Sequence, residues 1–393
     1  MIFLTGADLV LPDRVLTGGT IVIDGDRIID VVQGAPASSP ADVRIELHDH
    51  TIVPGFIDVH VHGVEGTDAL DGEGAIARIA SRLPRYGVTA FCPTTVACAP
   101  ADLRAVLAGV RAARLDPPGG SSRVLPAHLE SNFINPDYKG AQPLECLRTP
   151  AADSRSDGDF TGADILREIE NARPDVGILT IAPELEGAID LIRQLTAHGH
   201  HVSLGHSGAS YEQALEGIAA GARQATHLFN RMTPINHRVP GLASAVLEND
   251  DVAAEIVCDG VHVHPALIRI ALAAKTPAKV MAITDGTGGS GLPAGSRAIL
   301  GGRAITVRDA AYLDDGTLAG SVLTMDRAFA MLVRTIGLSP VDAATICATS
   351  PARALGLSGF GVIAPGAIAD LAVLGRDFTL RQTWIAGELV FGN

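Results

Sequence analysis

Two histidines, His60 and His62, stand two residues apart at the end of a short apolar run, PGFIDVHVHG at 54–63. In a β-strand, residues two apart point to the same side, so both imidazoles face one point. Two nitrogen ligands in this arrangement indicate a metal ion. A pair of histidines in a polar loop is the alternative, because two ligands alone do not define a site. The other ligands must come from elsewhere in the chain.

Polar residues also follow four other apolar runs, in the motifs His128-Leu129-Glu130, Gly205-His206-Ser207, Thr226-His227 and Thr284-Asp285. The strands of a parallel barrel present their carboxyl ends on one face, where these side chains would meet. Nitrogen and oxygen ligands without thiolate suit Zn²⁺, which we take first, and also Fe²⁺, Mn²⁺ or Co²⁺. The sequence predicts a site for one or two divalent ions with six candidate ligands: His60, His62, Glu130, His206, His227 and Asp285.

Such a site has the equipment to hydrolyse an amide or ester. A bound metal brings the pKa of its water toward about 7 and polarises a carbonyl oxygen. Asp285 is then the expected proton carrier, taking a proton from the attacking water and returning it to the departing amine. The alternative is that Asp285 is a metal ligand and nothing more.

Eight short apolar runs alternate with helical stretches, which is typical of βα units around a parallel sheet. The runs predict an α/β fold, a (β/α)8 TIM barrel. A doubly wound open sheet is the alternative, but no GxGxxG motif opens the first helix. The expected strands are 56–59, 88–91, 124–128, 178–181, 201–204, 224–227, 254–257 and 280–284, and the clearest helices are 74–86, 101–114, 186–198 and 265–274.

The two ends of the chain have a different pattern. Alternating apolar residues at 19–24 and 27–32 flank Gly25-Asp26 and predict a hairpin, and 366–374 and 383–390 read as further strands. Neither end has enough strands to be stable alone, so we expect them to form one small β-sandwich domain. The predicted domains are 1–52 plus 356–393 for the sandwich and 53–355 for the metal-dependent barrel. Two long insertions, 144–159 and 286–318, follow the third and eighth strands.

The composition excludes some classes of partner. The 393 residues carry 44 acidic and 30 basic side chains, a net charge of -14, which disfavours nucleic acid and anionic lipid. Five scattered cysteines without a CxxC pair predict reduced thiols in the cytoplasm. We expect neither a signal peptide nor a membrane span, because no basic n-region or run of about 18 apolar residues occurs.

Longer motifs around these residues resemble the N-acetylglucosamine-6-phosphate deacetylase family of the amidohydrolase superfamily. The resemblance covers essentially the whole chain, and its fold is a barrel with a β-sandwich made from both termini. It is carried by HVH at 60–62, HLESNFINPDYKGAQ at 128–142, GHS at 205–207, ATHLFNRM at 225–232, RVPG at 238–241, DGVH at 259–262, TD at 284–285, LAGS at 318–321 and PGAIADL at 365–371.

The resemblance implies a role for each matching residue. Glu130, His206 and His227 would hold the principal metal, and an intact His60/His62 pair leaves room for a second ion sharing Glu130. Asp285 would be the general base and acid. Asn230 and His262 match sugar-contacting positions, Arg238 the phosphate-binding arginine, and Leu318, Ala319 and Gly320 a backbone contact to the substrate. Arg238 also suits phosphate physically, although a loop arginine is often only a solvated charge. Relatives with this fold also suggest a homodimer.

Four alterations near the predicted pocket, which involve five residues, depart from the family pattern. Ser131-Asn132 replaces a Gly-Pro pair, Arg231 replaces alanine, and Gly286 follows Asp285 in place of alanine. Gln142 replaces a histidine that helps polarise the acetyl carbonyl; glutamine can donate an N–H to an oxyanion but cannot become cationic. These changes indicate either a retained reaction on a different substrate or family drift with the same substrate.

The expected activity is metal-dependent removal of an N-acetyl group from an amino sugar by metal-activated water, with N-acetylglucosamine 6-phosphate or a related N-acetylhexosamine phosphate as the first substrate. Gln142 and Arg231 motivate an alternative, the same hydrolysis on another N-acyl amino sugar or an N-acyl amino acid. A sugar-binding regulator without catalysis would predict loss of ligands or of Asp285, and none is lost.

Overall fold

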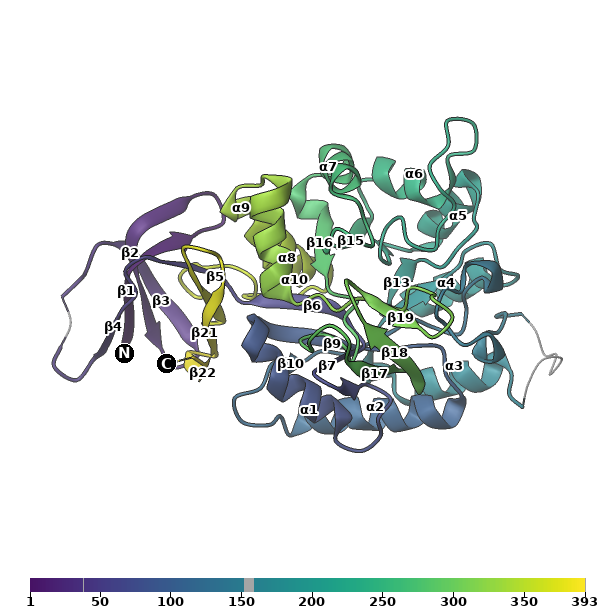
Figure 1. The fold of residues 1–393 in the computed structure, drawn as a ribbon, viewed down its shortest axis with the longest axis horizontal. Helices are drawn as coiled ribbons and strands as arrows, with labels where there is room; N and C mark the ends of the chain where they lie inside the picture. Colours follow the sequence, from purple (N-terminus) through teal and green to yellow (C-terminus); the bar gives the residue numbers. More distant parts are fainter. Residues whose placement is uncertain (38, 152–158, 393) are drawn as a thin grey trace.

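The computed structural model describes residues 1–37, 39–151 and 159–392, and its centre is the predicted barrel (Figure 1). The predicted third strand is split into two short strands, β10 and β11, which pair with the same neighbour, β9. The barrel strands are β6 (Phe56–Val61), β9 (Val88–Thr95), β10 (Arg123–Val124), β11 (Ala127–Leu129), β12 (Val176–Ile181), β13 (His201–Leu204), β14 (Gln224–Ala225), β15 (Ala253–Val257) and β16 (Val280–Ile283).

All neighbouring barrel strands run parallel, in the order β6, β9, β11, β12, β13, β14, β15, β16. The nearly closed barrel is joined where β16 ends beside β6, because Asp285 N–H donates to the His60 carbonyl at 3.0 Å and His62 N–H donates to the Gly286 carbonyl at 2.8 Å. The predicted (β/α)8 fold is confirmed. The joint matters for function because it brings the first and eighth strand ends together.

Helices follow most barrel strands and cover the outside of the barrel (Figure 1). Two of them, α3 and α5, begin at capping boxes: Thr161 with Asp164, and Ser210 with Gln213. The helices are α1 (Ala75–Arg82), α2 (Pro100–Leu115), α3 (Gly162–Asn171), α4 (Ala188–Ala197), α5 (Tyr211–Ala220), α6 (Gly241–Glu248), α7 (Pro265–Ala274), α8 (Met325–Met331), α9 (Pro340–Ala344) and α10 (Ser350–Ala354).

The two chain ends share one eight-stranded sheet, drawn in purple and yellow beside the barrel in Figure 1. The hairpin predicted around Gly25 is present between β2 and β3, and β20 pairs antiparallel with β5 and so joins the two ends. The strands are β1 (Ile2–Val10), β2 (Val15–Asp24), β3 (Arg27–Gln33), β4 (Val43–Glu46), β5 (His50–Pro54), β20 (Leu371–Gly375), β21 (Leu380–Ile385) and β22 (Glu388–Phe391).

This terminal sheet has its own buried core, which includes Leu4, Ile21 and Trp384. Val53 and Leu374 instead pack in the core of the barrel, so the sheet is anchored to it. The boundaries that divide the chain into 1–52 with 356–393 and 53–355 remain a proposal. No helix in the described part of the chain has the length and apolar character needed to cross a membrane.

The insertion after β16 forms a three-stranded antiparallel sheet of β17 (Arg297–Leu300), β18 (Arg303–Val307) and β19 (Ala311–Leu313). Its apolar side chains, among them Ile305 and Val307, pack with Val96 from the end of β9. This sheet therefore lies next to the carboxyl-terminal face of the barrel. The other predicted loop, 144–159, is described only in part, because 152–158 lie outside the described residues; it begins with a 3₁₀ turn at Leu144–Cys146.

Candidate metal centre and active site

Glu130, His206 and His227 meet just beyond the ends of β11, β13 and β14. One carboxylate oxygen of Glu130, Oε1, lies 2.8 Å from the Nε2 atoms of both His206 and His227. The two Nε2 atoms are only 3.0 Å apart. The three side chains are buried and together form one of the residue groups able to hold a metal ion.

His60, His62 and Asp285 form a second such group at the joint between β6 and β16. The Nε2 atoms of His60 and His62 are 3.2 Å apart, and Asp285 Oδ1 lies 3.5 Å and 3.3 Å from them. Glu130 connects the two groups, because its Oε2 is 3.4 Å from His62 Nε2. The structure therefore brings all six predicted ligands into one continuous cluster.

The spacing of the imidazole nitrogens fits a metal ion. Two nitrogens bound tetrahedrally to Zn²⁺ at about 2.0–2.1 Å stand about 3.3 Å apart. The separations of 3.2 Å in the His60/His62 pair and 3.0 Å in the His206/His227 pair are close to this value. His206 donates its Nδ1–H to the carbonyl of Tyr138 at 2.8 Å, which leaves the lone pair of Nε2 facing the cluster.

The backbone at the strand ends is bent sharply to aim these side chains. His206, His227 and Asp285 have φ angles of 47°, 31° and 49°, in the left-handed region that residues other than glycine rarely adopt. Each such residue costs about 1–3 kcal/mol and is retained where the surrounding structure enforces it. Backbone strain at three of the six predicted ligands indicates that these turns are retained because they orient functional side chains.

The charges of the cluster favour a cation at its centre. Burial alone would raise the pKa of Glu130, but His206 and the hydrogen bonds from His206, His227 and His62 hold it well below its usual range. Burial opposes a charge on His62, yet Asp285 and Glu130 raise the pKa of His62 to about 10. His60 differs, because burial lowers its pKa to about 4. The carboxylates thus stay ionised and hold a proton on His62 where a metal ion can replace it.

A cavity of about 440 Å³ opens over the cluster. Tyr138, Phe229 and Leu300, none of which we predicted, also line it, and Leu300 comes from the inserted sheet. Eleven of the predicted site residues line this cavity: His62, Glu130, Gln142, His206, His227, Asn230, Arg231, His262, Asp285, Leu318 and Gly320.

Three predicted residues lie outside the cavity wall. His60 is fully buried beneath it, and Ala319 is buried behind its neighbours Leu318 and Gly320. Arg238 lies exposed in the loop after Pro234, where its backbone N–H donates to the Asn236 side chain at 2.9 Å. Within one chain, therefore, Arg231 reaches the cavity and Arg238 does not.

Gln142 has a more definite position than its sequence suggested. Its Oε1 accepts the backbone N–H of Ala97 at 2.7 Å, and its Nε2–H donates to Oε2 of Glu130. The side chain is thereby fixed against Glu130. His262 is similarly fixed by a hydrogen bond from Nδ1 to Asp259 at 2.6 Å.

Two buried acids beneath the site, Asp58 and Glu255, were not among the predicted residues. Asp58 accepts the Thr284 hydroxyl at 2.6 Å, which ties β6 to β16, and burial raises its pKa to about 7. Glu255 in β15 contacts His60, and burial also raises its pKa to about 7. The available signal was an acid inside an apolar run, at 254–257 for Glu255, which is costly unless the acid has partners.

The sequence profile of the amidohydrolase family matches residues 51–390. The chain therefore belongs to the amidohydrolase family, whose members are metal-dependent hydrolases. This agrees with the barrel and with the metal-ligand cluster at its carboxyl-terminal face.

Relatives within the family are similar over nearly the whole chain. The N-acetylglucosamine-6-phosphate deacetylase of Vibrio furnissii is 34% identical over 376 residues, 94% of this chain and 90% of the relative. The N-acetylgalactosamine-6-phosphate deacetylase of Escherichia coli O157:H7 is 32% identical over 365 residues, 92% of this chain and 93% of the relative. The resemblance predicted from the motifs is confirmed.

Solved structures agree. A variant of the N-acetyl-D-glucosamine-6-phosphate deacetylase of Mycobacterium smegmatis, in complex with N-acetyl-D-glucosamine-6-phosphate, superimposes with a TM-score of 0.88 at 33% identity. The alignment covers 99% of both chains. The likeness therefore includes the terminal sheet as well as the barrel.

Proposed function

We propose that this protein is a metal-dependent deacetylase that hydrolyses N-acetylglucosamine 6-phosphate to acetate and glucosamine 6-phosphate. The observation that carries the proposal is that the six predicted ligands form one cluster, and that five of them line a single cavity together with Asn230, His262, Leu318 and Gly320. The names of the relatives supply the substrate, since they are deacetylases of N-acetylhexosamine 6-phosphates.

Glu130, His206 and His227 are the proposed ligands of the principal ion, and His60 and His62 with Glu130 those of a second. A divalent ion held there acidifies water and polarises the acetyl carbonyl. Zn²⁺ is the first candidate for ligands of this type, with Fe²⁺, Mn²⁺ and Co²⁺ as the others. Elemental analysis of the purified protein decides both the metal and the number of ions per chain.

Asp285 is the proposed proton carrier. Its carboxylate lies in the cavity wall between the metal ligands and the sugar-site residues, and its pKa is lowered against burial by His60 and His62. An ionised Asp285 accepts a proton from the attacking water as the water oxygen bonds to the acetyl carbon. It then returns the proton to the amine nitrogen when the C–N bond breaks.

The remaining cavity residues are proposed to position the sugar phosphate. Asn230, His262, Leu318 and Gly320 line the cavity and can contact the sugar ring. Arg231, also in the wall, offers a guanidinium that can bind phosphate through paired hydrogen bonds. In this proposal the acetyl group reacts at the metal-ligand cluster, and these groups bind the sugar phosphate, the part of the substrate that does not react.

An acetate-release assay with metal-loaded protein tests the function. The panel consists of N-acetylglucosamine 6-phosphate, N-acetylgalactosamine 6-phosphate and unphosphorylated N-acetylglucosamine. We expect the first to give the highest kcat/KM and the free sugar to be at least tenfold poorer. If neither N-acetylhexosamine 6-phosphate releases acetate, the proposal is wrong.

Departures from the family pattern favour a second candidate, the same hydrolysis on a different N-acyl amine. Gln142 stands fixed against Glu130 at a position where the motif resemblance implies a histidine, and Arg231 adds a cation to the cavity wall. Other N-acyl amino sugars and N-acyl amino acids are therefore the next compounds to test. A higher kcat/KM for one of them than for N-acetylglucosamine 6-phosphate would favour this candidate.

We also propose that the protein is a homodimer in the cytoplasm. Leu267 and Ile270, three residues apart on α7, are 40% and 52% exposed, which suits a surface covered by a second subunit. The five cysteines carry free thiols, as expected in a reducing compartment. Analytical ultracentrifugation of the protein, compared with the double variant Leu267→Asp/Ile270→Asp, tests the dimer.

A further inference from the structure

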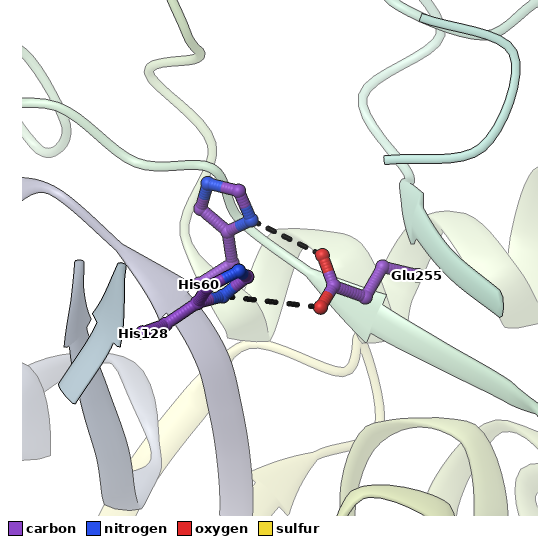
Figure 2. A group of neighbouring side chains, drawn as sticks. All are labelled: His60, His128 and Glu255. Carbon is purple, nitrogen blue, oxygen red and sulfur yellow. Dashed lines mark hydrogen bonds and ion pairs between the residues drawn. The ribbon is translucent and has the colours of Figure 1, made fainter. Parts of the chain in front are cut away.

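Glu255 lies beside His60 and His128 (Figure 2) and is not part of the cavity wall. It is the one charged residue of β15, between Ala254 and Ile256, and its side chain is fully buried. A buried carboxylate in a strand is costly unless it is hydrogen-bonded, so its partners indicate why it is there.

The hydrogen-bond partners of Glu255 are two of the predicted metal ligands, while its Oε1 lies 3.9 Å from Nδ1 of His128, the second dashed line in Figure 2. Its Oε2 lies 3.1 Å from Nδ1 of His60, a contact drawn as a dashed line in Figure 2. The same oxygen accepts the backbone N–H of His227 at 3.4 Å. An ionised carboxylate oxygen has no hydrogen to donate, so it accepts from Nδ1–H of His60 as it does from the main-chain N–H of His227.

This hydrogen bond determines the tautomer of His60. With the hydrogen on Nδ1, the lone pair of a neutral ring is on Nε2. That nitrogen is 3.2 Å from Nε2 of His62 and 3.5 Å from Asp285, so it faces the cluster. His62 has no such support in the described structure, because its Nδ1 is buried without a hydrogen-bond partner.

His60, His128 and Glu255 also lie close enough together to hold a metal ion themselves. The hydrogen bonds of His128 exclude this use. Its Nδ1 lies 3.0 Å from the carbonyl of Val59, which only accepts, so Nδ1 carries a hydrogen. Its Nε2 is bonded to the hydroxyl of Thr180 at 2.9 Å. His128 therefore packs against the His60 ring, with the ring centres 4.6 Å apart, and offers no free lone pair toward Glu255.

We propose that Glu255 is a positioning residue that fixes His60 as an Nε2 ligand and so determines whether the His60/His62 pair binds a second metal ion. The inference rests on the proposed function for the existence of the metal centre. It goes further in assigning control of one of the two ion positions to a residue of β15 that touches neither the cavity nor the ion.

Metal titration of metal-stripped protein tests the assignment through binding rather than activity. Glu255→Leu removes the acceptor at similar size, and the matched control Glu255→Gln keeps an acceptor oxygen. We expect two Zn²⁺ per chain for the wild-type protein and for Glu255→Gln. We expect Glu255→Leu to bind the second ion at least tenfold more weakly, as is usual when the partner of a ligating histidine is lost, with the first ion unaffected.

Two titration results overturn the proposal. One is a second ion bound by Glu255→Leu as tightly as by the wild-type protein. The other is a wild-type protein that binds one ion with an affinity unchanged by His60→Gln, since His60 would then not be a ligand.

A spectroscopic measurement covers the case in which Glu255→Leu does not fold. In metal-free wild-type protein labelled with ¹⁵N-histidine, we expect the His60 ring, identified by the signal lost in His60→Gln, to carry its hydrogen on Nδ1. A hydrogen on Nε2 contradicts the proposal. Failure of the deacetylase function would give a different result. The protein would bind two ions and His60 would carry its hydrogen on Nδ1, but no acetate would be released.

Discussion

Glu130 is the residue at which the two halves of the metal centre meet. Its Oε1 contacts His206 and His227, while its Oε2 faces His62 and accepts a hydrogen bond from Gln142. A carboxylate with both oxygens directed at different imidazoles can be shared by two ions. The chemistry of the site therefore depends on residues from the ends of five different strands acting as one group.

Replacing Asp285 with asparagine should separate binding from proton transfer. An amide of the same shape cannot accept a proton, and general acid–base catalysis contributes about 10²–10⁴-fold. We expect kcat of Asp285→Asn to fall about a thousandfold with the metal content unchanged. Steady-state acetate release and elemental analysis of the same sample measure both. A kcat within tenfold of wild type would show that Asp285 is not the proton carrier.

Metal affinity should rise with pH. In the metal-free protein Asp285 and Glu130 raise the pKa of His62 to about 10 against the effect of burial, so His62 is protonated at pH 7. A metal ion needs its lone pair and must displace this proton, which makes binding about tenfold tighter per pH unit. Competition with a chelator at pH 6, 7 and 8 measures the slope. In His62→Gln the slope of log affinity against pH should be smaller by one, because one proton fewer is released on binding. A slope of zero in the wild-type protein contradicts the account.

The two arginines near the site can be distinguished by the substrate's phosphate. Arg231 lines the cavity, whereas Arg238 matches the family's phosphate position by sequence but lies outside the cavity. We expect Arg231→Ala to raise KM for the phosphorylated sugar about tenfold, the loss of about 1.4 kcal/mol that one charge-assisted hydrogen bond provides. The KM of the free sugar should not change. A larger effect of Arg238→Ala would show that the sequence match, rather than the cavity, identifies the phosphate site.

At the scale of elements, the segment that follows the inserted sheet returns to the barrel at Asp285. Gly320 follows β19 with φ of 65°, and the N–H of Ser321 donates to the Asp285 carbonyl at 2.8 Å. A Cβ on Gly320 would lie 2.9 Å from that carbonyl oxygen and 2.7 Å from Thr287. This segment therefore supports the backbone of the proposed proton carrier, while the inserted sheet contributes Leu300 to the cavity.

Gly320→Ala should reduce activity through this contact. The control is Gly316→Ala, which has the same left-handed backbone, with φ of 85°, and nothing within 4 Å of the added Cβ. Both variants should lose about 1–2 kcal/mol of stability, the cost of a left-handed residue. Only Gly320→Ala should also lose kcat, about tenfold, because Asp285 must shift. Equal kcat values in the two variants would refute the coupling.

Local patterns in the sequence were sufficient to predict the barrel strands and the convergence of the six candidate ligands at the strand ends. Apolar runs identify buried strands, and polar residues directly after them mark the strand ends. Glu255 could not be assigned in this way, because its reason for being buried is His60, which is 195 residues away in sequence. The pairing of strands outside the barrel, such as β17 to β19, also depends on contacts that the spacing of apolar residues along the sequence does not predict.

At the scale of the whole molecule, the chain ends are tied to the catalytic barrel. β5 leads directly into β6, which carries His60 and His62, and β20 pairs with β5 along its length. Arg123 from the barrel also forms an ion pair with Asp370, at 3.1 Å, next to the last strands. The terminal sheet thus holds the start of the first barrel strand, although it contributes no residue to the cavity wall.

Metal-dependent acetate release from N-acetylglucosamine 6-phosphate tests the central claim most directly. The protein is stripped with a chelator, assayed, and assayed again after addition of two equivalents of Zn²⁺ per chain. We predict no acetate from the stripped protein and equal amounts of acetate and glucosamine 6-phosphate after Zn²⁺ is restored. Acetate release that persists without metal, or none when both ions are bound, would contradict the account.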